Sequence, residues 1–143
     1  MKKISCIISF IILVSCGQKK NTLTYDEGII INKIKWATRN VDEVGTFTDK
    51  SENLGKFYQW NRKKAWNTTD IQVEDWDSSY PVGFKWEGDN DPSPKGWRLP
   101  TYDEIKSLLD DTKVNSEWVI LNGVKGRKFT CKESGNSLFL PAA

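Results

Sequence analysis

The sequence predicts an α+β domain that is rich in loops, with short antiparallel strands and one clear helix at about 102–110. Residues 118–121 are an apolar run, and the Asn-Gly pair that follows is a strong signal for a β-hairpin turn. Thr101 and Glu104 form a capping box ahead of apolar residues at helical spacing. Between such segments the chain is dominated by Asp, Asn, Ser, Pro and Gly, which favour turns over long regular elements.

The remaining elements follow in chain order from the apolar pattern. Alternating apolar residues over 29–36 predict a first strand, and residues 57–60 predict either a strand or the first turn of a short helix. Residues 61–95 are expected to be irregular. The helix at 102–110 presents one apolar face, and two further strands are expected at 126–131 and 137–140. The residues of the apolar helical face are Tyr102, Ile105, Leu108 and Leu109.

The N-terminus has the pattern of a lipoprotein signal peptide at residues 1–15. Lys2 and Lys3 precede an uncharged stretch that is too short to span a bilayer as a stable helix. The Leu-Val-Ser-Cys sequence at 13–16 resembles a bacterial lipobox, which predicts cleavage before Cys16 and lipidation of that residue. An ordinary secretory peptide is the alternative. Acyl chains contribute about 0.8 kcal/mol per buried methylene, so we expect the membrane as a partner through this anchor.

Composition narrows the classes of function. Residues 16–24 would be the lipidated cysteine and a polar tether, and residues 25–143 form one domain. The chain has 21 basic and 19 acidic residues; without Lys2 and Lys3 both counts are 19, which argues against a nucleic-acid partner.

Cys131 would be the one remaining unmodified cysteine, so no internal disulfide is expected. We expect a buried, inert thiol there, with a thiol activated by neighbouring lysines as the alternative.

The segment NDPSPKGWRLPTYDEIKSLL, residues 90–109, is the most informative part of the chain. Its prolines and glycine mark a turn, and Pro100 holds Leu99 out of helical geometry before Thr101 starts the helix. Together with KWATRNV (35–41), GKFYQW (55–60) and SGNSLFLPAA (134–143), it resembles the Fibrobacter succinogenes major paralogous domain, a module of secreted bacterial proteins. The resemblance runs from about Ile29 to Ala143.

This resemblance implies a C-type-lectin-like fold and brings no well-defined activity. Related domains continue beyond the SLFLPAA stretch, so it also implies a partial domain that lacks the family's last strands. The residues that match the family's structural motif are Trp36, Trp97, Arg98, Pro100, Thr101 and Glu104. We expect Arg98 to be partly buried and paired with Asp91 or Glu104, because a buried charge without a partner is costly.

The seven tryptophans are the main candidates for ligand contact. Each buries about 150–250 Å² when it packs in a core, which is a sufficient structural reason for their number. The alternative for the loop tryptophans is a platform on which a sugar stacks. The possible ligand contacts are Trp60, Trp66, Trp76 and Trp86, whereas we expect Trp36, Trp97 and Trp118, on predicted strands, to be core.

Catalytic and metal-binding patterns are weak. The chain has no histidine, which removes the commonest general base. The acidic run 87–91 suggests calcium, but the twelfth position from Asp89 is Pro100 where an EF-hand needs glutamate, so we expect a solvated turn with Asx hydrogen bonds. Asp75 and Asp77 could in principle cleave a glycoside, although a solvated acidic loop is the default. No metal and no cofactor are expected.

The sequence therefore favours a lipoprotein of the cell envelope, most simply at the outer membrane, with a non-catalytic binding or adhesion module for a glycan or a surface protein. A carboxylate-based glycan hydrolase is one alternative. A truncated, non-functional remnant is another.

Overall fold

The computed structural model describes residues 23–67, 77–79 and 83–142. This part of the chain has a mixed architecture, as expected for the α+β class: one short α-helix, one 3-10 turn, and short antiparallel strands arranged in three small sheets. The elements are β1 (Ile29–Ile31), β2 (Ile34–Trp36), β3 (Phe57–Tyr58), β4 (Ala65–Trp66), η1 (Gly88–Asn90), α1 (Tyr102–Ser107), β5 (Val114–Leu121), β6 (Val124–Cys131) and β7 (Ser137–Pro141).

The largest sheet confirms the hairpin and the last strand predicted from sequence. Its order is β5-β6-β7, antiparallel throughout, with Trp118 opposite Arg127 and Phe129 opposite Leu138. Asn122 and Gly123 join β5 to β6 with φ values of 48° and 84°. Positive φ at both central residues is the turn geometry that matches the twist of a hairpin, and Asn-Gly adopts it at little cost.

The single strand expected over 29–36 is instead a second hairpin, β1–β2. Asn32 and Lys33 turn the chain with φ values of 48° and 68°. Lysine at a positive φ is uncommon, and for this reason the pattern did not indicate a turn. The hairpin packs its fully buried Ile31 against the β5–β7 sheet.

The main core lies between this hairpin, the residue after α1 and one face of the large sheet. Its buried members are Ile31, Leu108, Val114, Phe129, Cys131 and Leu138. The expectation that Trp118 is core is wrong, because its side chain is 58% exposed. The covering strands β1 and β2 have three residues each, whereas β5 has eight, so they protect only the end of the sheet near Val114.

Helix α1 begins where the sequence predicts and ends earlier. The Thr101 side chain accepts a hydrogen bond from the Glu104 backbone N–H, and Glu104 accepts one from the Thr101 N–H at 2.7 Å, which confirms the capping box. The helix stops at Ser107, not at 110. Of the expected apolar face only Leu108 is buried, whereas Tyr102, Ile105 and Leu109 are exposed.

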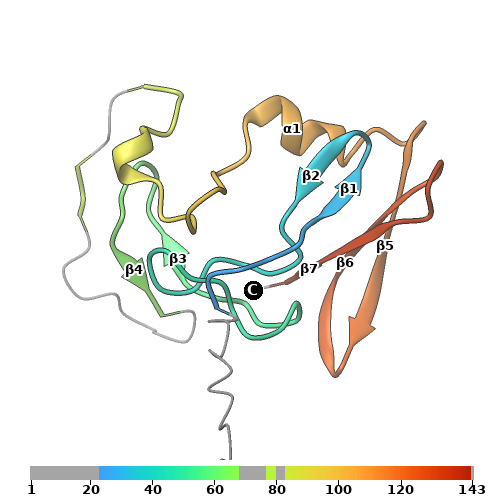
Figure 1. Ribbon diagram of the computed structural model, residues 1–143, viewed down its shortest axis with the longest axis horizontal. Helices are drawn as coiled ribbons and strands as arrows, with labels where there is room; N and C mark the ends of the chain where they lie inside the picture. The colour runs from blue at the N-terminus through green and yellow to red at the C-terminus, as the bar shows by residue number, and fades with distance from the viewer. Residues whose placement is uncertain (1–22, 68–76, 80–82, 143) are drawn as a thin grey trace, which may run out of the picture.

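Figure 1 shows how the elements are arranged. The β5–β7 sheet and the β3–β4 hairpin lie at opposite ends of the molecule, with β1, β2 and α1 beside the sheet (Figure 1). The η1 turn lies beside the β3–β4 hairpin, and the long loop between β2 and β3 crosses the centre (Figure 1). Trp66 belongs to β4 and therefore lies at the end of the molecule far from the β5–β7 sheet.

Candidate functional site

Two of the predicted ligand-contact residues meet at the β3–β4 end of the molecule. The rings of Trp60 and Trp86 lie 5.3 Å apart, centroid to centroid, with an interplanar angle of 71°. This edge-to-face arrangement is one that aromatic pairs prefer. Trp60 remains 46% exposed, whereas the Trp86 indole N–H donates to the carbonyl oxygen of Asn90 at 2.8 Å. Trp86 is thus fixed, and it supports a Trp60 ring that solvent reaches.

Asn61 connects the two segments that carry the tryptophans. Its side chain is buried, and its backbone has a φ of 54°, a conformation that asparagine tolerates better than most residues. The Asn61 Oδ1 accepts from the Glu87 backbone N–H at 2.9 Å and from the Asn90 side chain at 3.2 Å. One amide therefore joins the segment after β3, which carries Trp60, to the η1 turn.

The residues that flank Trp60 in the sequence make polar contacts with the 77–79 segment. The Gln59 amide donates to the Asp77 carbonyl oxygen at 2.8 Å, and the Arg62 guanidinium contacts the Asp77 carboxylate at 2.6 Å and the Ser79 hydroxyl at 2.6 Å. We call Trp60 and Trp86, with Gln59, Arg62 and Asp77, the tryptophan platform.

Asp77 is one of the two carboxylates considered for glycoside cleavage. Hydrogen bonds from the Ser79 hydroxyl and backbone N–H, and then from Arg62, lower the pKa of Asp77 to about 2. Its carboxyl group is therefore ionised at neutral pH and holds no proton to give to a leaving group. Asp75 lies outside the described residues, as do Trp76 and Cys16.

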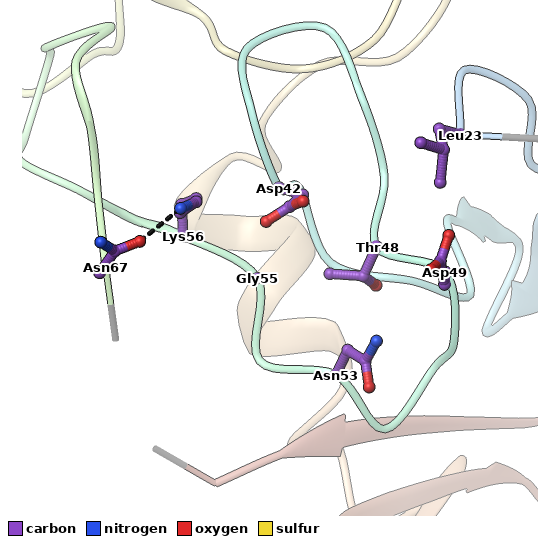
Figure 2. Close-up of a pocket in the computed structure, with 8 residues that line it drawn as sticks. All are labelled: Leu23, Asp42, Thr48, Asp49, Asn53, Gly55, Lys56 and Asn67. Carbon is purple, nitrogen blue, oxygen red and sulfur yellow. Dashed lines mark hydrogen bonds between the residues drawn. The ribbon is translucent and has the colours of Figure 1, made fainter. Parts of the chain in front are cut away.

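A polar pocket of about 270 Å³ is lined mainly by the loop that connects β2 to β3. In Figure 2, Asp42, Thr48 and Asn53 surround the hollow, and Lys56 points toward Asn67. The carboxylates of Asp42 and Asp49 make no hydrogen bond or ion pair with the described residues, so they are available as acceptors. The complete lining is Leu23, Asp42, Thr48, Asp49, Asn53, Gly55, Lys56 and Asn67.

Backbone hydrogen bonds shape this pocket. The Lys56 N–H donates to the Val41 carbonyl oxygen at 3.1 Å, which closes the loop. Gly55, at a φ of 74°, passes so near that oxygen that a side chain there would collide with it. Burial, with smaller contributions from Glu43 and Asp42, raises the pKa of Tyr58 to about 12, and its protonated hydroxyl donates to the Asp42 carbonyl oxygen.

Three other tryptophans of the described residues, Trp66, Trp97 and Trp36, have different surroundings. Trp66 is only 7% exposed and has the Lys64 ammonium 4.1 Å from its ring centroid, so its ring offers little surface to a ligand. Trp97 packs edge-to-face on Phe47 at 5.9 Å, and Trp36 packs against the main core.

The charge partners of the 90–104 motif are partly as predicted. Arg98 donates two hydrogen bonds to the Glu104 carboxylate, at 2.6 and 2.8 Å, so the pairing with Glu104 is confirmed. The expected burial of Arg98 is wrong, since its side chain is 61% exposed. Asp91 instead accepts from the backbone N–H groups of Ser93 and Leu99, the predicted Asx hydrogen bonding.

A buried charge network that the sequence did not indicate surrounds Asp26. Its side chain is 2% exposed and accepts from the Gly28 and Thr38 backbone N–H groups, the Thr38 hydroxyl and Arg39. The Asp-x-Gly spacing at 26–28 is the one available sequence signal, because Asp commonly bonds the N–H two residues ahead.

Comparison of the chain with protein-family models, with curated proteins and with solved structures gives no match. Within the described ranges, no three His, Cys, Asp or Glu side chains are grouped so that they could hold a metal ion. No helix in that part of the chain has the length and apolar character of a membrane span. The fold and the site define an α+β domain with an exposed aromatic platform and a polar pocket.

Proposed function

We propose that this chain is a cell-envelope lipoprotein, anchored through Cys16 at the outer membrane, whose domain is a non-catalytic module that binds glycans. The observation that carries the proposal is the Trp60 ring, which is 46% exposed and is held in place by Trp86 at 5.3 Å. A ring that is fixed before binding loses little conformational entropy when a ligand stacks on it.

The surroundings of Trp60 fit a sugar better than an apolar ligand. A sugar ring has a C–H face, which packs on an aromatic ring, and an edge of hydroxyl groups, which needs hydrogen-bond partners. Gln59 and Arg62, which flank Trp60 in the sequence and both contact Asp77, supply polar groups on the same segment. Asp42 and Asp49, in the polar pocket, supply acceptors for hydroxyls of a longer glycan. A surface protein is the alternative ligand.

The finer fold assignment belongs to the same proposal. We infer a C-type-lectin-like domain of the Fibrobacter succinogenes major paralogous type. Support comes from the motif residues, the capped helix after Pro100 and the short antiparallel strands.

Binding to a glycan array, followed by calorimetry with the best ligand, tests the proposed function. Trp60→Ala should weaken binding at least tenfold, about 1.4 kcal/mol. Trp118→Ala is the matched control, because Trp118 is also exposed to solvent (58%) and lies on β5, at the other end of the molecule. Equal losses in both variants, or no glycan bound by folded protein, would contradict a glycan site at Trp60.

The lipid anchor is tested separately by metabolic labelling with palmitate. We expect Cys16→Ser to abolish the label and release the protein from membranes, while Cys131→Ser, at a buried cysteine, retains both. Label that persists in Cys16→Ser would overturn the anchor.

A further inference from the structure

A large apolar cleft includes none of the platform residues and borders the polar pocket at Lys56, which lines both. Its volume is about 790 Å³, and it runs between β2, the 93–105 segment and β7. Clefts of about 300–1,000 Å³ are the usual size of small-molecule sites. The apolar lining on which the argument depends is Ile34, Trp36, Trp97, Leu108, Leu138 and Leu140.

Trp36 leaves a polar group unsatisfied in this cleft. Its indole Nε1 is buried and has no hydrogen-bond partner among the described residues. A buried N–H without a partner costs free energy and is uncommon in folded proteins. Because Nε1 is closed to solvent in this structure, a ligand oxygen in the cleft would accept this hydrogen bond once the Trp36 ring turns toward it.

The charges on the cleft are unbalanced. Arg39 and Arg98 also line it, but they are paired with Asp26 and Glu104. Lys35 and Lys95 are exposed, form no ion pair with the described residues, and so place free positive charge where the cleft meets solvent. The Lys35 ammonium lies 5.6 Å from the centroid of the Trp97 ring, directly beside the apolar lining.

We propose that the cleft binds one molecule of a single-chain carboxylate amphiphile of the fatty-acid class. The apolar chain would lie along Leu108, Leu138 and Leu140. The carboxylate would accept from the Trp36 indole N–H in the field of the Lys35 and Lys95 ammonium groups. This site is independent of glycan binding at Trp60.

Laurate, added below its micelle concentration to purified protein with a cooperative thermal melt, is the first probe. Calorimetry should give saturable binding of one molecule per chain. In ¹H–¹⁵N spectra the Trp36 indole signal, assigned among the seven tryptophans with Trp36→Phe, should move downfield as it gains an acceptor. Dodecylammonium, which has the same number of carbon atoms and the opposite charge, should bind at least tenfold more weakly.

Paired variants test the contribution of charge without touching the core. Lys95→Glu should weaken laurate binding by about threefold, as expected for an exposed ion pair. Lys85→Glu makes the same change of charge at an exposed lysine outside the cleft and should leave binding unchanged. Trp60→Ala should also leave it unchanged, which separates this site from the platform.

The proposal is overturned if the folded protein does not bind laurate, or binds it without moving the Trp36 indole signal. Equal affinity for dodecylammonium would remove the charge argument and the carboxylate class with it. A dimer that laurate does not dissociate, with the Trp36 indole N–H protected from exchange, would assign the cleft to a second copy of the chain instead.

Discussion

The carboxylate of Asp26 lies 3.1 Å from the guanidinium of Arg39, and both side chains are withdrawn from solvent. Arg39 also donates to the carbonyl oxygens of Tyr25 and Thr48. This pair therefore links three segments: the strand entry before β1, the exit of β2 and the loop that borders the polar pocket.

Loss of the Asp26 carboxylate should be the most damaging polar substitution in the described part of the chain. We expect Asp26→Ala to reduce the free energy of unfolding by about 3 kcal/mol, because it leaves Arg39 and two backbone N–H groups buried without their acceptor. Urea denaturation measures this change. Asp89→Ala, at an exposed aspartate, should stay within about 0.5 kcal/mol. Similar losses in the two variants would show that the buried network is not the cause.

Acid should weaken the fold through carboxylates whose pKa is lowered. The side chain of Arg98 and then the backbone N–H of Thr101 lower the pKa of Glu104 from 4.5 to about 2. For Asp26, burial alone would raise the pKa, but hydrogen bonds from Thr38, Gly28 and Arg39 outweigh it and the pKa is lowered. A lowered pKa stabilises the folded state above the unfolded-state pKa, and this stability is lost as pH falls.

The pH range is set by Glu104. Its contribution should be complete above pH 4.5 and disappear toward pH 2, and it should not exceed about 1 kcal/mol because Arg98 is exposed. Urea denaturation at several pH values should show a smaller acid loss in Glu104→Gln than in the unmodified protein. Glu117→Gln, at an exposed glutamate on β5, should follow the unmodified protein. The assignment to Glu104 fails if both variants lose stability alike.

Gly126 should be the least replaceable glycine of the β5–β7 sheet. A Cβ there would lie 2.5 Å from the Leu140 carbonyl oxygen and would overlap the Phe139 ring. Since the backbone oxygen of a paired strand cannot move aside, we expect Gly126→Ala to cost about 1–3 kcal/mol by thermal or urea denaturation. Gly88→Ala is the control, because a Cβ at Gly88 meets nothing within 4 Å. A neutral Gly126→Ala would mean that β6 and β7 separate more easily than their pairing indicates.

Signals within a few residues predicted the turn and the helix start. Burial was not predictable in this way, because it depends on which distant segments pack on each face. The Asn122-Gly123 turn and the Thr101–Glu104 capping box are encoded within a few residues, so both appear where expected. The exposure of Trp118 could not be predicted, because it depends on the length of the β1–β2 hairpin that packs on the distant sheet. Apolar periodicity indicates which side chains share a face and does not indicate what covers that face.

The candidate site was predictable in kind and not in arrangement. Trp60 and Trp86 were among four loop tryptophans, and composition alone could not separate them from the buried Trp66. Their pairing depends on Asn61 bonding to a turn 26 residues away. Sequence patterns carry no signal for a contact of that span.

Asn61 therefore provides a test of the platform that leaves both aromatic rings in place. Asn61→Gly keeps a residue that tolerates the φ of 54° and removes the amide that accepts from Glu87 and Asn90. We expect a loss of about 1–3 kcal/mol in unfolding free energy, the cost of leaving buried donors unsatisfied.

The same variant should free the Trp60 ring. Acrylamide quenching of tryptophan fluorescence should rise, and glycan affinity should fall although no ligand-contacting ring has changed. Asn122→Gly is the matched control, since Asn122 has a similar φ of 48° in an exposed hairpin turn. If Asn61→Gly and Asn122→Gly bind glycan equally well, Asn61 does not position the platform, and rigidity at Trp60 is not what the proposed binding requires.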